Sequence, residues 1–334
     1  MDPIEERSLA SVNAVAVSPD GAYRVAGGRE ESWHRGNVIL WAPWGSGRNV
    51  AMGEIWRRRF LGNSERYIEG EVKSLAFSPD GKHVLIGGTD PGWEPDSEEE
   101  AEEEEASGAS TVFHEQSGRI QLVSVPEGNI VHNITIEKNS PEGMGIHAVA
   151  FSPDGAKFAA LDMYQDVHVF DAATGDKLLF VPSPGNMSVF VLAFTLDSKQ
   201  LVTINVHDAA TGDFVAYLKG HEHRVQAIAM HPDGTRAMTG SEDETMREWD
   251  LETYTELRQW PCAAYALGYS ADGTHIVSGD MGGELALWNV ASGECLRRCT
   301  AYEDTVVEEL AVASDGTVVT GGAGAARVWK AFAP

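Results

Sequence analysis

The chain has 334 residues, of which 43% are hydrophobic, so it can bury a sizeable core in one large all-β domain or two smaller ones. Its formal net charge of −26 argues against nucleic acid and against an anionic membrane surface as partners, because both attract clustered lysine and arginine. No run of about 18 apolar residues is present, and residues 1–10 lack the apolar core of a signal peptide, so we expect neither a membrane span nor secretion.

A short turn recurs seven times along the chain, each time after a run of alternating apolar residues. The sequences are SPDG at 18–21, 78–81 and 152–155, TLDS at 195–198, HPDG at 231–234, SADG at 270–273 and ASDG at 313–316. The runs before them are VNAVAV, VKSLAF, IHAVAF, VFVLAF, VQAIAM, YALGY and VEELAV. Asp-Gly between two such runs predicts a hairpin, because glycine accepts the positive φ of the turn.

A second turn follows about 20 residues later in several units, a spacing typical of repeat architectures. It reads ATGD at 173–176 and 210–213, LETY at 251–254 and ASGE at 291–294. The run before it ends in an aromatic residue, usually followed by a polar one: Trp41, Phe170-Asp171, Trp249-Asp250, Trp288-Asn289 and Trp329-Lys330. Each unit therefore has four short strands, and seven units of roughly 40 residues predict a propeller rather than a sandwich.

The repeat resembles that of the WD40-repeat proteins, from about residue 10 to Trp329. Residues 220–250 are the best copy, because Gly220-His221 opens this unit and Trp249-Asp250 closes it. The resemblance implies a single all-β domain over residues 1–334. This domain is a seven-bladed propeller of four-stranded antiparallel blades. The last unit ends at its third strand, AARVWK, and the family implies that the N-terminal segment IEERSL, residues 4–9, supplies the fourth and closes the ring.

Long connections follow on one face of the predicted propeller, conventionally the top, in the first three units. They span residues 27–37, 55–71, 87–118 and 136–146. Long loops on a rigid scaffold often carry binding, although neutral drift is the alternative. The aromatic and basic residues of these loops are typical of protein–protein hot spots, so we predict that they contact a partner: Trp33, His34, Arg35, Trp56, Arg57, Arg58, Arg59, Phe60, Tyr67 and Trp93.

The sequence WRRRF, residues 56–60, holds three consecutive basic residues in an acidic protein. It has three interpretations: a contact to the chain's own acidic loop, a contact to an acidic partner, or a strand edge whose arginines lie beside a buried Trp56 and Phe60. The acidic loop EPDSEEEAEEEE, residues 94–105, carries nine of the 51 acidic residues. We expect the insertion 88–117 around it to be disordered, and a docking site for a basic partner is the alternative.

The fourth unit is short, because only 10 residues, from Ser198 to Asp208, separate its turn from its closing pair, against 16 in units three, five and six. Two strands of four or five residues and their turn do not fit in that length. Either this unit lacks a proper second hairpin or residues are missing from the sequence, and we favour missing residues.

In the WD40 family, one histidine, one aspartate, one serine or threonine and one tryptophan form a buried hydrogen-bond chain within a blade. By position these are His221, Asp243, Thr239 and Trp249. The chain satisfies polar groups that would otherwise be buried without partners, so we interpret it as structural rather than catalytic.

Trp260 occupies the position of that histidine in the sixth unit, and Tyr302 or Glu303 occupies it in the seventh. These residues line the top face, where we place Trp260 among the partner contacts, or they pack in the space that the absent histidine leaves. Cys295 and Cys299 lie four residues apart in a predicted strand, too far to bond, which favours three free thiols and a cytoplasmic protein.

We therefore expect a non-enzymatic scaffold, monomeric by itself and without a cofactor, that binds a protein or peptide on the top face near blades 1–3. Two alternatives remain. One is a constitutive subunit of a larger assembly. The other is a propeller with a metal or small molecule in its channel, for which the candidate ligands lack a fixed spacing: His221, His223, Asp162, Asp166, Asp280 and Asp304.

Overall fold

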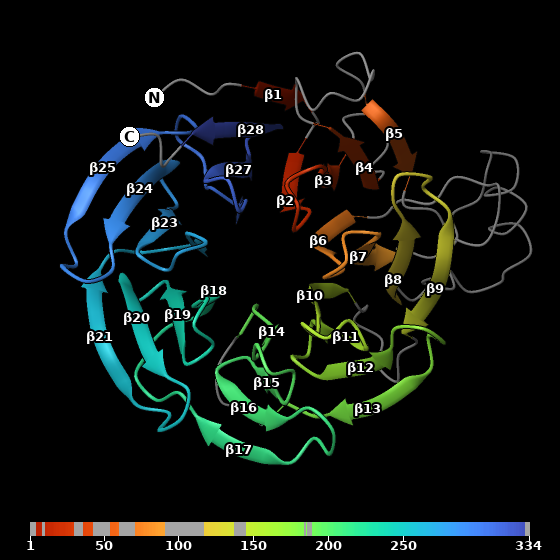
Figure 1. Cartoon of the computed structure of the whole chain (residues 1–334), viewed down its shortest axis with the longest axis horizontal. Helices are drawn as coiled ribbons and strands as arrows, with labels where there is room; N and C mark the ends of the chain where they lie inside the picture. Colours follow the sequence, from red (N-terminus) through yellow and green to blue (C-terminus); the bar gives the residue numbers. More distant parts are fainter. Residues whose placement is uncertain are drawn as a thin grey trace, which may run out of the picture.

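The computed structural model describes residues 5–8, 11–29, 36–42, 54–59, 71–90, 117–136, 145–183, 185 and 189–330. In these ranges the chain forms 28 strands in seven four-stranded antiparallel sheets, arranged as a ring around a central channel (Figure 1). The predicted all-β, seven-bladed propeller is therefore confirmed. The same ranges hold no helix with the length and hydrophobicity to cross a membrane.

Each of the first six blades uses four consecutive strands, counted from the channel outward. Blade 1 has β2 (Ser11–Val17), β3 (Arg24–Arg29), β4 (Gly36–Trp41) and β5 (Glu54–Arg59), and blade 2 has β6 (Glu71–Phe77), β7 (His83–Asp90), β8 (Ser117–Ser124) and β9 (Ile130–Ile136). Blade 3 has β10 (Ile146–Phe151), β11 (Lys157–Asp162), β12 (Val167–Asp171) and β13 (Lys177–Val181), and blade 4 has β14 (Ala193–Phe194), β15 (Gln200–Val202), β16 (Asn205–Asp208) and β17 (Phe214–Tyr217). Blade 5 has β18 (Val225–Met230), β19 (Arg236–Ser241), β20 (Thr245–Asp250) and β21 (Glu256–Pro261), and blade 6 has β22 (Ala266–Tyr269), β23 (His275–Gly279), β24 (Glu284–Asn289) and β25 (Cys295–Thr300).

Blade 7 joins segments from both ends of the sequence. It contains β26 (Glu309–Val312), β27 (Thr317–Gly322), β28 (Ala325–Lys330) and, as its outermost strand, β1 (Glu5–Ser8). Glu5 pairs with Val328 and Ser8 with Ala325. The expected closure by the segment 4–9 is confirmed, and it covers an edge of β28 that would otherwise be open.

The repeated turns lie on one face, which we call the bottom face. In the first turn, the Ser18 hydroxyl donates to Asp20 over 2.6 Å, and the same carboxylate accepts the backbone N–H of Ala22. Blade 4 has Ser198 where the other turns have glycine, and Ser198 still adopts a φ of 61°. The turn is therefore made by its aspartate even where glycine is absent.

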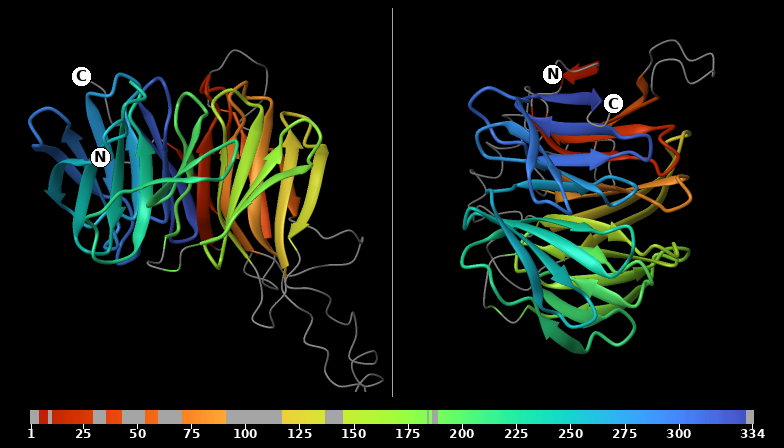
Figure 2. Two further views of the ribbon diagram at one scale, coloured as in Figure 1. Left: turned by 90° about the horizontal axis from the view of Figure 1, so that it is seen from below. Right: turned by 60° about the vertical axis from the view of Figure 1, so that its left-hand side comes forward.

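The apolar core consists of seven separate clusters, one between each pair of neighbouring blades. Successive strand residues point to opposite faces of a blade, so every blade contributes to the cluster on each side. Side views show the blades standing edge-on around the ring (Figure 2). Each blade is thus held by packing on both faces, and the inner ends of the blades surround the channel.

Blade 4 forms all four strands with the residues that it has, so its short length does not require that residues are missing from the sequence. Its second and third strands have three and four residues, and only Thr203 and Ile204 separate them. Since β15 is so short, β14 pairs with it only at Ala193 and Phe194. The segment before β14 turns to blade 5 instead, where the Phe190 N–H donates to the carbonyl oxygen of Val225 over 3.2 Å.

Candidate functional site

The four side chains of the predicted hydrogen-bond chain lie together in blade 5. His221 contacts Asp243 through Nδ1 at 2.8 Å and the Thr239 hydroxyl through Nε2 at 2.7 Å. The Trp249 indole donates to the same hydroxyl over 2.8 Å. Burial lowers the pKa of His221 against the opposing effect of Asp243. The groups satisfy one another inside a blade, which is a structural arrangement.

Blades 6 and 7 keep parts of this chain. Trp288 donates to Ser278 over 2.9 Å, and Trp329 donates to Thr320 over 2.9 Å. Tyr302 takes the place of the histidine in blade 7, where its buried hydroxyl lies 3.0 Å from the Thr320 hydroxyl and donates to the carbonyl of Ala325. Of the two residues expected at this position, Tyr302 therefore fills it, while Glu303 is exposed.

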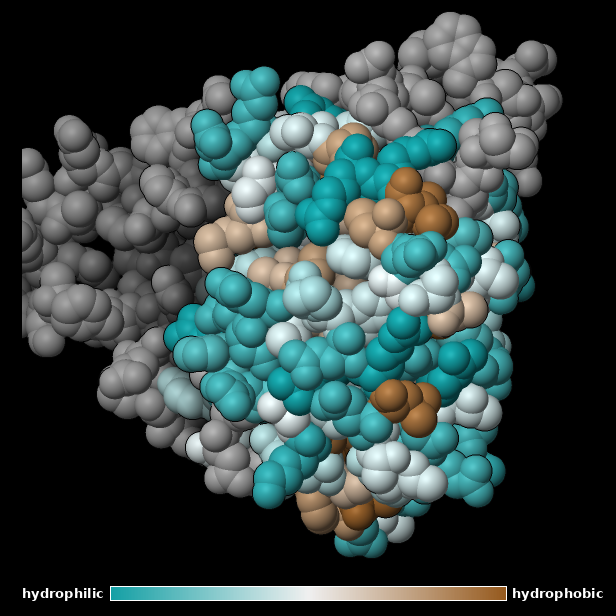
Figure 3. All heavy atoms as spheres, turned by 90° about the vertical axis from the view of Figure 1, so that its left-hand side faces the viewer, coloured by the Kyte–Doolittle hydropathy of each residue, from teal (hydrophilic) through white to brown (hydrophobic). Residues whose placement is uncertain are grey.

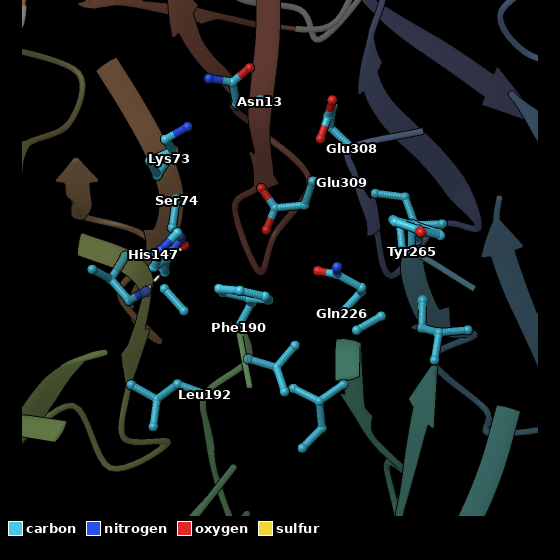
Figure 4. A pocket seen from close by; sticks show the side chains of 18 of the residues that line it. Asn13, Lys73, Ser74, His147, Phe190, Leu192, Gln226, Tyr265, Glu308 and Glu309 are labelled. Carbon is cyan, nitrogen blue, oxygen red and sulfur yellow. Dashed lines mark hydrogen bonds between the residues drawn. The ribbon is translucent and has the colours of Figure 1, made fainter. Parts of the chain in front are cut away.

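Seven side chains, one from each blade, surround the channel where the inner strands begin. We call them the channel ring: Asn13, Lys73, His147, Phe190, Gln226, Tyr265 and Glu308. They line a cavity of about 460 Å³, and Figure 4 shows them around its opening. Inner strands begin at the face opposite the repeated turns, so the channel ring lies at the top face.

In four of the seven blades, the backbone explains why the ring residue points into the channel. In blades 1, 2, 3 and 5, the pairing of the inner strand shifts by one residue at this position, for example between Val12 and Ala14. A β-bulge leaves one residue unpaired and redirects its side chain. Six of the seven ring residues are the second residue of their run in VNAVAV and the equivalent sequences, and Tyr265 is the first residue of the shorter run YALGY. This regularity was visible in the sequence, but we missed it.

One side of the opening is acidic. Asn13 donates to Glu71 over 2.7 Å, and the Lys73 ammonium lies 2.6 Å from the same carboxylate. Glu308 and Glu309 of blade 7 face this group across the cavity (Figure 4). Burial raises the pKa of Glu308, and the nearby Glu71 adds to that increase against the effect of Lys73.

Glu309 lies beside the channel ring and links two blades. Its Oε2 accepts the backbone N–H of Val15 over 2.9 Å. Part of the side chain faces the channel, and burial of the rest in the channel wall raises the pKa of Glu309 to about 8 against the effect of the Val15 hydrogen bond. At neutral pH this group is therefore largely a neutral carboxylic acid.

The opposite side of the opening is aromatic. The rings of His147 and Phe190 meet edge to face with centroids 4.8 Å apart, and the Arg224 guanidinium lies 5.7 Å from the Phe190 centroid. Tyr265 lines the same cavity from blade 6. Burial lowers the pKa of His147. Aromatic rings and an arginine at an opening can hold apolar and cationic groups of a partner.

Sequence comparison agrees with this geometry. The family described as "WD domain, G-beta repeat" matches residues 62–91 and 212–250, and the second range contains blade 5 strands β19 and β20. These matches agree with two features of the structure: the seven-bladed ring, and the hydrogen bonds among His221, Thr239 and Trp249. The chain is a WD40-repeat propeller.

Several known proteins are similar to parts of this WD40 propeller. Mouse TBC1 domain family member 31 is 33% identical over 138 residues, which is 39% of this chain and 13% of that protein. Rat apoptotic protease-activating factor 1 is 21% identical over 197 residues, 56% of this chain and 15% of that protein. The target of rapamycin complex subunit wat1 of Schizosaccharomyces pombe is 28% identical over 116 residues, 34% of this chain and 37% of that protein. The matches cover well under two thirds of each relative.

Most of the predicted partner contacts of the WD40 propeller fall outside the described residues. These are Trp33, His34, Arg35, Phe60, Tyr67 and Trp93, together with most of the acidic insertion 88–117. Trp56, Arg57, Arg58 and Arg59 lie in β5, the outer strand of blade 1, where Trp56 pairs with Leu40 and Arg59 with Asn37. Their predicted placement in a loop was wrong, because the outer strand of this blade begins later than we expected.

Trp260 is 2% exposed and belongs to the apolar cluster between blades 5 and 6. Arg258 covers one face of its ring at 4.9 Å. This position fits the packing interpretation of Trp260 better than a contact at the top face. The three cysteines are free, and Cys295 and Cys299 lie in one strand, β25.

The outer rim of blades 5 and 6 offers no continuous apolar surface among the described residues. Figure 3 looks at this flank and shows hydrophobic side chains in small separate groups among hydrophilic ones. Single exposed apolar residues are normal on proteins. Within the described ranges, no three histidine, cysteine, aspartate or glutamate side chains are placed to hold a metal ion.

Proposed function

We propose that this WD40 propeller is a non-enzymatic scaffold that binds a segment of a partner protein over the channel ring. WD40 propellers generally act as non-enzymatic scaffolds, and wat1 is by name a subunit of a protein complex. The observation that carries the proposal is the aromatic side of the opening, where Phe190 and Tyr265 line a preformed cavity and Arg224 lies over the Phe190 ring. Tyrosine and arginine in such places often dominate binding energy.

The division of the opening suggests how a partner binds. An apolar side chain packs on Phe190 and the His147 ring, while polar or basic groups face Glu308 and Glu71. The predicted top-face loops of blades 1–3 stay part of the proposal. The strand ends to which they attach, such as Arg29 and Arg59, lie on the same face as the channel ring. We place this activity in the cytoplasm and the free protein as a monomer.

Capture from native cells followed by mass spectrometry tests this function. The bait is the wild-type protein, and the test variant carries Phe190→Ala and Tyr265→Ala. A matched control carries Phe214→Ala and Leu257→Ala, two exposed apolar residues of the outer strands. We expect a protein that wild type and control capture and the test variant loses. A partner kept by the test variant and lost by the control would instead place binding on the rim.

A second variant separates the channel ring from the loops. It carries Trp33→Ala, Arg57→Ala, Arg58→Ala and Arg59→Ala with the channel ring intact. Loss of the same partner extends the site to blade 1, and full retention limits it to the channel opening.

The cavity also favours a second candidate function, the binding of a small polar ligand in the channel. Its volume of about 460 Å³ lies in the range of ligand pockets, and its lining is rich in polar groups. Native mass spectrometry of the purified protein tests this candidate, and a bound mass lost in a Glu309→Gln variant is the expected result.

A further inference from the structure

A second cavity opens at the bottom face between blades 2 and 3, on the side opposite the channel ring. It has a volume of about 460 Å³. Its walls come from the repeated turns of the two blades and from strands β8 and β9, and we call it the bottom groove. Its main lining residues are Asp80, His83, Leu122, Val131, Phe151 and Asp154.

The bottom groove is open because the side chain that spans the equivalent place in the next two blades is different here. In blade 3, the Lys157 ammonium reaches across to blade 4 and donates to the carbonyl of Ala209 over 3.0 Å. In blade 4, the Gln200 amide reaches blade 5 and donates to the Tyr254 hydroxyl over 2.7 Å. The equivalent residue of blade 2 is His83, whose ring makes no hydrogen bond within the described ranges.

The floor of the bottom groove is apolar and belongs to the core between the two blades. Leu122 is buried, Phe151 is half-buried, and Val131 is 45% exposed. The outer wall is fixed, because the His132 ring lies 3.2 Å from the carbonyl oxygen of Ala172 in the neighbouring blade. The groove is therefore preformed, and it leaves apolar surface exposed to solvent.

Two carboxylates stand on opposite sides of the floor. The Ser78 hydroxyl donates to Asp80 over 2.7 Å, and the Ser152 hydroxyl donates to Asp154 over 2.6 Å. These bonds hold the pKa of both carboxyl groups below the usual range, so both are ionised at neutral pH. Each turn uses Oδ1 of its aspartate. Asp154 lines the groove, and Ser198 and Lys157 also lie near its carboxylate. Oδ2 of Asp80 lies 3.4 Å from the exposed Lys82 ammonium.

The residues that line the bottom groove include no lysine or arginine. An apolar floor between two ionised carboxylates is complementary to a segment with one basic and one apolar side chain. We propose that the bottom groove is a second docking site, and that it takes an extended segment of a partner protein with an arginine or lysine next to a large apolar residue.

In this arrangement the basic group lies between Asp80 and Asp154, and the apolar side chain covers Leu122, Val131 and Phe151. Because the groove and the channel ring are on opposite faces, two partners can bind at once. The proposal goes beyond the scaffold function of the top face and does not depend on it.

Fluorescence polarisation with a defined peptide tests the bottom groove. The probe is a labelled glycine–serine peptide with a central leucine–arginine–leucine sequence, and two control peptides replace the arginine by glutamate or both leucines by serine. We expect saturable binding of the probe to the wild-type full chain. Each control peptide should bind with an affinity lower than that of the probe by roughly fivefold or more.

Two variants locate the site. His83→Lys places a lysine where blade 3 has Lys157, so the groove is bridged, and Asp154→Asn removes one charge while its oxygen still accepts from Ser152 and Ala156. Asp197→Asn is the matched control, since Asp197 has the same role in the turn of blade 4, where Gln200 already spans the gap. We expect the first two to weaken probe binding roughly fivefold or more and the third to leave it unchanged. Circular dichroism confirms that each variant is folded.

Three results would overturn the proposal: no saturable binding of the probe, equal loss in the Asp197→Asn control, or full binding by His83→Lys. A wild-type dimer that dissociates in the His83→Lys variant would show that a second copy of the chain, rather than a partner, fills the groove. The top-face capture experiment is unaffected by any of these results, so failure of one proposal is distinguishable from failure of the other.

Discussion

Blades 5, 6 and 7 differ from blades 1 to 4 in how their third strand is fixed. In the later blades a tryptophan of this strand donates to a hydroxyl of the second strand, as Trp249 does to Thr239. In blade 1, Trp41 is equally buried, but its indole N–H has no partner in the described part of the chain. In blades 3 and 4 the position belongs to Phe170 and His207.

All seven blades nevertheless have the same four-stranded form, since an apolar cluster fills every space between neighbours. Packing between blades is therefore sufficient for the architecture, and the hydrogen-bond chain adds stability and rigidity within a blade. This difference between the blades can be tested by removing the hydrogen-bond chain from a blade that has it and by supplying part of it to a blade that lacks it.

The largest effect should come from Thr239→Val. The hydroxyl serves both His221 and Trp249, so its removal leaves two buried polar atoms without partners. We expect a loss of about 2–4 kcal/mol in the free energy of unfolding, measured by urea denaturation. Thr320→Val in blade 7 is the matched comparison, and it should cost less because Tyr302 keeps its bond to the carbonyl of Ala325. Equal losses would contradict the distinction between the two blades.

Glu309 provides a pH-dependent test of blade 7. Its pKa is raised from 4.5 to about 8 by burial, so the folded chain holds a proton that the unfolded chain has released between these values. Stability from this residue is present below pH 4.5 and is lost as the pH rises toward 8. From pH 6 to pH 8 the wild type should lose about 2 kcal/mol more than Glu309→Gln, a variant that can still accept from Val15. Parallel pH profiles of the two proteins would rule this out.

Hydrogen exchange compares blade 4 with blade 5 directly. The amides of β15 and β16 belong to a short hairpin without a tryptophan, whereas those of β19 and β20 are tied by the chain around Thr239. We expect protection in β15 and β16 to be lower by about tenfold or more, which mass spectrometry of peptides can measure. Similar protection in both hairpins would show that packing alone sets local stability.

The smallest effect should come from Ala26→Ser in blade 1. Ala26 occupies the place of Thr239, and a hydroxyl there gives the Trp41 indole an acceptor. We expect stabilisation of about 0.5–1.5 kcal/mol by thermal or urea denaturation. Ala26→Val is the control without an acceptor. Destabilisation by both variants would mean that the site lacks room for any larger side chain.

Much of the fold followed from the sequence because turns and strand period are local properties. The Asp-Gly turns and the aromatic ends of the third strands predicted all seven blades, and Trp249-Asp250 predicted the hydrogen-bond chain by position. The length of blade 4 misled us, since strands of three residues are uncommon but are sufficient when both faces are packed. Arg57 to Arg59 were misplaced because the sequence before β5 does not repeat the ATGD turn of the other units.

The channel ring was harder to predict. Phe190 and Tyr265 stand in apolar runs where they resemble core residues. In blades 1, 2, 3 and 5 a bulge directs the ring residue into the channel, as it does for His147 and Gln226. A single run does not show a bulge. Alignment of all seven runs on their turns reveals a variable position directly after a constantly apolar one, which is the signal for a channel-facing site.

The pairing of β1 with β28 has a consequence for how the protein is made. Glu5 lies beside Val328, so β1 has no partner on the ribosome until β28 has emerged. At a synthesis rate of about 5–20 residues per second, this wait lasts on the order of 15–70 seconds. Blades 1 to 6 use only consecutive strands and can form during that time. The final joining step is therefore a late, long-range event, in which an exposed strand edge must be kept from pairing with other chains.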